Sequence, residues 1–85
     1  IKESIVSIDS VILQNSDIKV VIGTEEGNLF VIKNWSDFPV KVKHCFKKRI
    51  NDVKFSYDDS FIIVCSGNSI SMMFMEEIED SFDYI

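Results

Sequence analysis

The sequence predicts an all-β protein made of two similar units, each with four short antiparallel strands. Three observations support this prediction. Apolar segments rich in Val, Ile and Phe recur about every ten residues, with polar turns between them. The pattern of the first half returns in the second half after a shift of about 42 residues. The middle segments of both halves are apolar at consecutive positions, which is typical of strands buried on both faces.

In the first unit, residues 1–46, the first expected strand covers residues 8–13, which alternate loosely between apolar and polar side chains. The turn QNSD leads to the strand IKVVIG, and the turn TEEG leads to the strand NLFVIK. Asp and Asn suit such turns because their side chains bond the local backbone, and Gly27 is expected to supply a positive φ. After the loop NWSDFP, the fourth expected strand is VKVKHCF, with Val40 and Val42 inward.

The second unit, residues 47–85, repeats this order with the strands INDVKF, FIIVC and SISMMFM, and SFDYI is its fourth expected strand. The shift of 42 residues aligns the apolar residues of the first strands, Ile8, Val11 and Leu13, with Ile50, Val53 and Phe55. It aligns the second strands through Val20, Val21 and Ile22 on Ile62, Ile63 and Val64. One deletion then brings Leu29 and Val31 onto Ile70 and Met72. No eleven-residue window has a helical period, so no helix is expected.

Burial on both faces favours the blades of a β-propeller, because each blade of a propeller is packed between two neighbouring blades. Two blades cover each other on one side only, so we expect the chain to be part of a larger propeller or to be covered by another chain. A monomer that unfolds cooperatively around a closed core would contradict this expectation. A self-contained small β-barrel or sandwich binding domain is the alternative, in which the two units would close through direct strand pairing.

Two segments carry a family resemblance. The segment INDVKFSYDDSFIIVCSGNSISMMFM resembles the first hairpin and following strands of a WD repeat, and VIGTEEGNLFVIKNW resembles the turn and third strand of another. The Trp-Asp pair of that family is absent, since Ile32-Lys33 and Met73-Phe74 stand near its places. The hairpin GTEEGNL is similar to repeats of large cilia- and flagella-associated WD-repeat proteins. The resemblance implies a non-catalytic cytoplasmic scaffold for protein–protein interaction, in a cytoskeletal or ciliary assembly, whose partners are other proteins and further blades of the same parent chain.

Composition argues against several other classes of function. The net charge of −5 argues against nucleic-acid binding, and no apolar run approaches the roughly 20 residues of a membrane helix. The two cysteines, Cys45 and Cys65, have only His44 near them, whereas a structural metal site needs about four ligands. Unpaired cysteines suit a reduced cytosolic setting. We therefore expect no metal and no cofactor.

An enzyme is not expected either. His44, Cys45 and Asp37 could form a thiol catalytic set, but a lone His beside a Cys is usually incidental. The turn TEEG lacks the pattern of a phosphate-binding loop and places two carboxylates where a phosphate would sit. One alternative stays open, in which these strands support an enzyme whose site lies elsewhere.

Two segments are the candidates for partner binding. The loop 34–39 holds Trp35 and Phe38, and Trp35 either contacts a partner or folds back over the hydrophobic interior. The basic residues that follow are candidate contacts to an acidic protein surface: Lys43, Lys47, Lys48 and Arg49. The other interpretation of this basic cluster is a solvated loop and edge strand.

Overall fold

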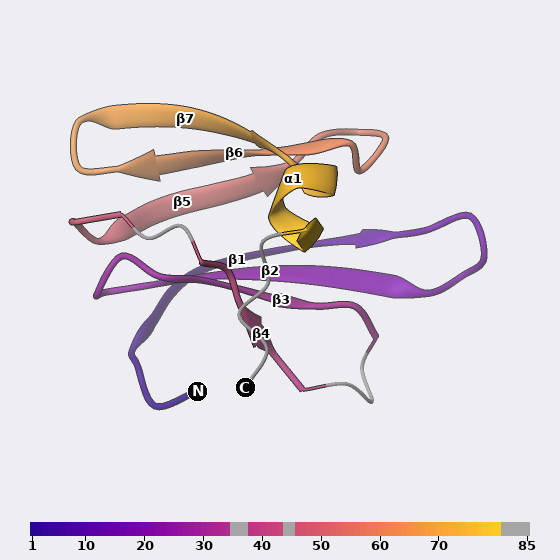
Figure 1. Ribbon diagram of the computed structural model, residues 1–85, viewed down its shortest axis with the longest axis horizontal. Helices are drawn as coiled ribbons and strands as arrows, with labels where there is room; N and C mark the ends of the chain where they lie inside the picture. Colours follow the sequence, from indigo (N-terminus) through magenta and orange to yellow (C-terminus); the bar gives the residue numbers. More distant parts are fainter. Residues whose placement is uncertain (35–37, 44–45, 81–85) are drawn as a thin grey trace.

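The protein consists mainly of two antiparallel β-sheets, as the sequence predicts. The computed structural model describes residues 1–34, 38–43 and 46–80. The first sheet has four strands in chain order, β1 (Ile5–Ile12), β2 (Ile18–Thr24), β3 (Leu29–Ile32) and β4 (Val40–Lys41). The second sheet has three strands, β5 (Ile50–Phe55), β6 (Phe61–Ser66) and β7 (Ser69–Phe74). The two sheets lie one over the other (Figure 1).

The turns follow the chemistry that the sequence indicates. Gly27 has a φ of 90° in the β2–β3 turn, as predicted, and Gly67 has a φ of 59° in the β6–β7 turn. Asp59 takes a φ of 64° in the β5–β6 turn, and Ser16 one of 70° in the β1–β2 turn. A left-handed conformation is tolerated by Asp because its short polar side chain can bond locally. Each positive φ lets the chain reverse tightly between two paired strands.

A short helix is the element that the sequence analysis missed. The chain leaves β7 into α1 (Met75–Asp80), and the expectation of no helix is therefore wrong. Six residues are too few for an eleven-residue window, although Met75 and Ile78 are buried at the i, i+3 spacing of one helix face. The predicted strand SFDYI lies outside the described residues. The described part of the chain contains no helix with the length and apolar character needed to cross a membrane.

The strand register confirms part of the predicted repeat and corrects the rest. In β2 and β6 the predicted matches hold, because Val20 and Ile62 occupy the same place in their sheets. The matches of Leu29 with Ile70 and Val31 with Met72 hold as well, since Leu29 pairs with Gly23 and Ile70 pairs with Cys65, 42 residues later.

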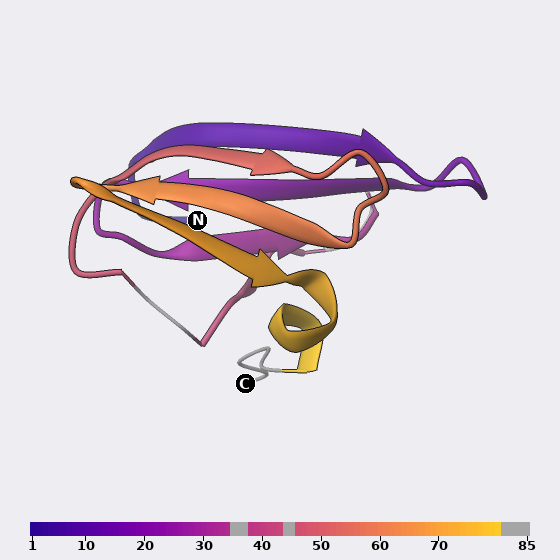
Figure 2. The ribbon, with the colours of Figure 1, turned by 90° about the horizontal axis from the view of Figure 1, so that it is seen from above.

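The predicted matches in the first strand are wrong by three residues. Ile22 pairs with Ile8, and its counterpart Val64 pairs with Val53, so that Ile8 corresponds to Val53 rather than to Ile50. The β1–β2 hairpin causes this shift because it is three residues longer, with nine residues between paired Ser10 and Val20 and six between Phe55 and Ile62. This longer hairpin projects beyond the second sheet in both ribbon views (Figures 1 and 2).

The core lies between the two sheets. Paired residues of an antiparallel sheet point to the same face, and neighbours along a strand point to opposite faces. The face of the first sheet that carries Val21 packs against the face of the second sheet that carries Val53. The buried residues of this core are Val21, Leu29, Val31, Val42, Ile50, Val53, Ile62 and Val64, with Met75 and Ile78 of α1.

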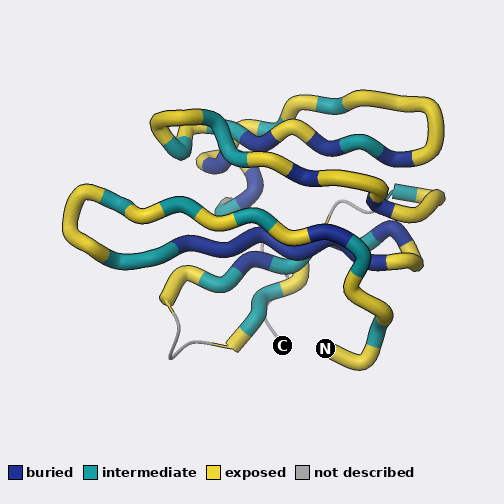
Figure 3. Tube along the Cα trace, turned by 180° about the vertical axis from the view of Figure 1, so that it is seen from behind, coloured by how far each residue is buried: buried dark blue, intermediate teal, exposed yellow. Residues whose placement is uncertain are grey.

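The two units contribute opposite faces to this core. Val21 of the first unit points inward, whereas its counterpart Ile63 points outward. Conversely, Val53 of the second unit points inward, whereas its counterpart Ile8 points outward. The units are therefore stacked head-to-tail, as successive members of one series, and are not related by a two-fold axis between them. Figure 3 shows that β2 is buried along most of its length, whereas β7 is largely exposed.

Three polar or small residues of the first sheet allow β5 to lie close against it. A Cβ atom placed on Gly23 would lie 2.3 Å from Cγ2 of Ile50, so only glycine fits there. The Ser7 hydroxyl donates a hydrogen bond of 3.1 Å to the carbonyl oxygen of Ile50. The backbone N–H of Phe55 donates a hydrogen bond of 2.7 Å to Oδ2 of Asp9. Side chains of β1 thus bond the backbone of β5 at both of its ends.

Gly23→Ala is expected to lower the free energy of unfolding by about 1–3 kcal/mol, because the added methyl group overpacks the contact with β5. Urea denaturation followed by circular dichroism measures the change. Ser10→Ala is the matched control, since Ser10 is exposed on β1 and its substitution is expected to change stability by less than about 0.5 kcal/mol. Equal stability of the two variants would contradict the close contact.

Candidate functional site

The predicted partner-binding residues fall at two separate places. Trp35 lies outside the described residues, so its two interpretations stay open. Phe38 is exposed in the connection between β3 and β4. The four basic candidates, Lys43, Lys47, Lys48 and Arg49, are also exposed, but they lie toward the other end of β3, near the β2–β3 turn. The structure therefore separates the aromatic candidate from the basic candidates.

The basic segment is the part of the chain that carries Lys43, Lys47, Lys48 and Arg49. Contacts of its backbone hold residues 46–48 in place, although the charged groups are exposed. The N–H of Phe46 donates a hydrogen bond of 2.8 Å to the carbonyl oxygen of Gly27 in the β2–β3 turn. The Ser66 hydroxyl donates one of 2.9 Å to the carbonyl oxygen of Lys48. The aliphatic part of Lys48 lies over Gly67, where an added Cβ would meet Cδ of Lys48 at 2.7 Å. Residues 46–48 are thus fixed against the turns of both sheets.

One acidic side chain accompanies the basic segment. Nε of Arg49 lies 3.5 Å from Oε2 of Glu25, and both side chains are more than half exposed. An exposed pair of this kind contributes about 0–1 kcal/mol, so it does not commit Arg49 to a structural role. Lys43, Lys47 and Lys48 present further positive charge on the same segment. This arrangement can bind an acidic surface.

A nearly buried ion cluster joins the two sheets to α1. Nζ of Lys19 in β2 lies 3.0 Å from Oδ2 of Asp59 and 2.8 Å from Oε1 of Glu79. The side chains of Lys19 and Asp59 are only 10% and 15% exposed. Lys33 approaches the other oxygen of Glu79 at 3.8 Å. The cluster therefore ties β2, the β5–β6 turn and α1 together by charge.

The pKa of Lys19 reflects this environment. Burial by itself would lower the pKa, but hydrogen bonds from the ammonium group to Glu79 and Asp59 outweigh it and raise the pKa above its ordinary value. Oδ1 of Asp59 is buried and accepts no hydrogen bond from the described residues. Lys19 is thus held in its charged form by two carboxylates, which suits a structural role rather than that of a general base.

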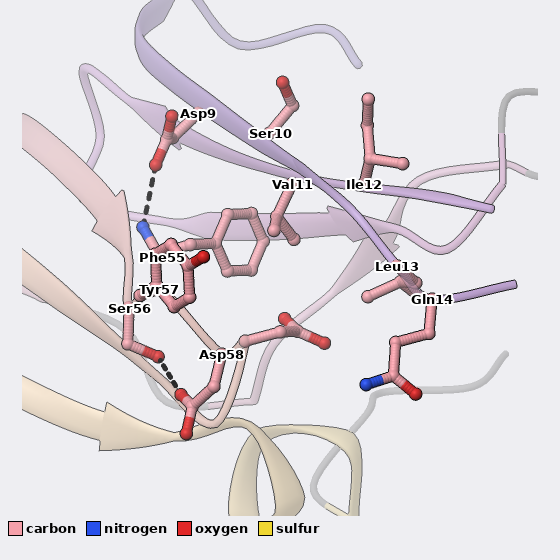
Figure 4. A pocket seen from close by; sticks show the side chains of 11 residues that line it. Asp9, Ser10, Val11, Ile12, Leu13, Gln14, Phe55, Ser56, Tyr57 and Asp58 are labelled. Atoms are coloured by element: carbon pink, nitrogen blue, oxygen red, sulfur yellow. Dashed lines mark hydrogen bonds between the residues drawn. The ribbon is translucent and has the colours of Figure 1, made fainter. Parts of the chain in front are cut away.

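A shallow pocket lies between the end of β1 and the β5–β6 turn (Figure 4). Asp9 lies on its upper side and accepts the hydrogen bond from the N–H of Phe55, while Asp58 lies in the turn below. Asp58 accepts hydrogen bonds from the hydroxyl of Ser60 at 2.6 Å and from that of Ser56 at 2.9 Å. These bonds, with that of Ser60 the largest cause, lower the pKa of Asp58 below its ordinary value. Both carboxylates are thus occupied in stabilising the fold.

The described residues bring together no group that could bind a metal ion. No group of three or more His, Cys, Asp or Glu side chains is placed to hold a metal ion within residues 1–34, 38–43 and 46–80. The imagined thiol set of Asp37, His44 and Cys45 lies outside these residues. Cys65 is an unpaired thiol of intermediate exposure on β6.

Two features escaped the sequence analysis. Lys19 is the polar residue at an alternate position in the apolar strand IKVVIG, on the same face as Val21, and this alternation could have indicated an inward-facing charge. The outward direction of Ile63, Ile70 and Met72 could not have been seen, because an unbroken apolar strand does not indicate which of its faces is covered.

Comparisons with protein-family models, with curated proteins and with solved structures find no match to this chain.

Lys19→Met is expected to lower the free energy of unfolding by about 3 kcal/mol, because Asp59 and Glu79 would keep their charges without the partner between them. Urea denaturation measures the loss. Lys33→Met removes the same charge from a half-exposed side chain and is expected to cost less than about 1 kcal/mol. If both variants lost the same stability, the ion cluster would not be structural.

The stability contributed by Lys19 is expected to depend on pH in the alkaline range. Because the folded-state pKa of Lys19 is raised, this contribution is fully present below the unfolded-state pKa of about 10.4 and is lost as pH rises through the folded-state value. Thermal unfolding between about pH 9 and pH 11.5 measures it. The stability difference between wild type and Lys19→Met should shrink over this interval, and a constant difference would contradict the assignment.

Proposed function

We propose that this chain is a non-catalytic scaffold module for protein–protein interaction, built from two consecutive units of the WD-repeat propeller type. The observation that carries the proposal is the head-to-tail stacking of the units. Counterpart residues such as Val21 and Ile63 point in the same direction along the stack, as they would in successive blades. A two-fold sandwich would place counterpart residues opposite each other across the core.

The packing of the sheets also favours blades over a closed barrel. A barrel made from these two units would need backbone hydrogen bonds between their edge strands. In the described residues no backbone ladder joins the two sheets, and the bonds between β1 and β5 come from the side chains of Ser7 and Asp9. Face-to-face packing without strand pairing is the arrangement of neighbouring blades.

The WD-repeat part of the proposal rests on the resemblance of the hairpin Ile50–Ser66 to the first hairpin of that repeat. The Trp-Asp pair is missing, so apolar packing between the sheets supplies the stability that the polar set of a regular repeat would add. In this proposal further blades of the same parent chain are among the partners. The place of action is a cytoplasmic assembly of the cytoskeletal or ciliary kind, and no nucleic acid, membrane, metal or cofactor takes part.

The basic segment is the proposed contact for an external partner. The backbone of its residues 46–48 is fixed by the bonds of Phe46 to Gly27 and of Ser66 to Lys48, so little ordering of this part is needed when a partner binds. Lys43, Lys47 and Lys48 keep exposed charges. An acidic protein segment, such as the carboxylate-rich tail of a cytoskeletal subunit, has the complementary charge.

The double variant Lys47→Glu/Lys48→Glu is expected to weaken binding of a fluorescent glutamate-rich peptide by at least about tenfold, which corresponds to about 1.4 kcal/mol. Fluorescence anisotropy at low ionic strength measures the affinity, and binding should weaken further as salt is added. The control is Lys2→Glu/Lys54→Glu, which makes the same change in net charge at exposed positions outside the segment. Equal affinities of the two double variants, or no binding by the wild type, would contradict the proposed contact.

A further inference from the structure

One edge of the second sheet is open along β7, which forms the outer border of that sheet (Figure 2). Just past β7, the N–H of Met75 donates a hydrogen bond of 2.9 Å to the carbonyl oxygen of Ser60, beside β6. Backbone groups of successive residues in a strand point alternately to its two sides. Counting back from Met75, three residues of β7 therefore direct their backbone N–H and C=O groups away from β6: Ile70, Met72 and Phe74. Among the described residues, none of these groups has a hydrogen-bond partner.

Every other edge strand in the described part of the chain has a feature that hinders pairing with another strand. The register of β1 is irregular between Ile5 and Ser7, and that of β5 is irregular between Ile50 and Asp52. The strand β4 has only two residues, and one of them is Lys41. By contrast, β7 has six residues, carries no charge and keeps an even register with β6. Because native sheets protect their edges with bulges, charges and short strands, the unprotected edge of β7 indicates a site for another strand.

The counterpart of this edge in the first unit already holds an antiparallel strand. Val31 pairs with β4, and the carbonyl oxygen of Leu29 accepts a hydrogen bond of 2.9 Å from the N–H of Val42. These two residues of β3 correspond to Met72 and Ile70 of β7. The fold itself therefore shows that an antiparallel strand fits at this position.

Charges of opposite sign lie at the two ends of β7. At its start, the aliphatic part of Lys48 lies over Gly67 in the β6–β7 turn. At its end, Glu76 and Glu77 are exposed in the first turn of α1. A second β7 that runs antiparallel to the first places the turn of each copy beside α1 of the other. Lys48 of each copy then lies toward the two glutamates of the other, so the edge is complementary in charge to itself.

We propose that β7 is the docking edge for a second copy of this chain, whose own β7 pairs with it antiparallel about a two-fold axis. The two three-stranded sheets then form one sheet of six strands. The open backbone groups of Ile70 and Met72 gain partners, and their exposed side chains come to lie beside those of the other copy. Because both copies use the same edge, the interface is isologous and assembly ends at the dimer. This pairing is independent of the proposed function.

Sedimentation velocity from about 5 to 500 µM tests the pairing on the wild type and two variants. Met72→Pro removes an N–H that points out of the sheet, so it blocks pairing at the edge and leaves the bonds to β6 intact. Ile63→Lys is the matched control, because Ile63 is 41% exposed on the same apolar face but lies on the central strand β6. Wild type and Ile63→Lys should form dimers and nothing larger, and Met72→Pro should stay monomeric.

Circular dichroism confirms that each variant folds, and Ile70→Lys replaces Met72→Pro if that variant does not. A wild type that stays monomeric, or that grows beyond a dimer, overturns the inference. A folded edge variant that still dimerises overturns it as well. A folded Ile63→Lys that stays monomeric would do the same, because it would place the contact on the face of the sheet rather than on its edge.

An exchange of charges tests the antiparallel arrangement. Lys48→Glu and Glu76→Lys change the net charge in opposite directions, yet each should raise the dissociation constant of the dimer about tenfold, because each brings like charges together. The double variant Lys48→Glu/Glu76→Lys restores both the opposite charges and the net charge, and should dimerise like wild type. Lys54→Glu, at an exposed position on the other edge strand, β5, controls for net charge and should also match wild type. A double variant as weak as the single variants would overturn the proposed pairing.

Discussion

The close packing of β5 against the first sheet determines how the rest of the structure is arranged. At Gly23 the missing side chain leaves room for Ile50, and Ser7 and Asp9 bond the backbone of β5 on either side of that contact. With β5 fixed in this way, β6 and β7 extend over the first sheet, and α1 closes one end of the core with Met75 and Ile78. The Lys19 cluster then ties the β5–β6 turn and α1 to β2.

The direction of this packing connects the fold to its proposed role. Stacked units that use opposite faces leave one outer face at each end of the pair. On the three-stranded sheet Ile63, Ile70 and Met72 are exposed on that face, whereas on the four-stranded sheet Val20 and Ile22 are buried. Exposed loops and turns remain available to other partners. The basic segment lies along two such turns, which join β2 to β3 and β6 to β7.

Much of the fold could be predicted from the sequence, because strand and turn signals are local. The positive φ of Gly27 and the match of β2 with β6 follow from turn chemistry and apolar pattern. The three-residue shift between β1 and β5 could not be predicted, since Ile8 aligns with Ile50 or with Val53 equally well by hydrophobicity and only the pairing decides. The ion cluster of Lys19, Asp59 and Glu79 depends on residues far apart in the chain, so no local pattern indicates it.

Methyl nuclear Overhauser effects in a dilute sample with labelled Ile, Leu, Val and Met methyl groups test the head-to-tail stacking most directly. The structure predicts contacts from the methyl groups of Ile50 and Val53 to those of Val21 and Leu29 across the core. It predicts no contact from Ile70 or Met72 to the first sheet within one molecule. Contacts of Ile70 and Met72 with Val21 and Leu29 would show counterpart faces packed together, and would contradict the account.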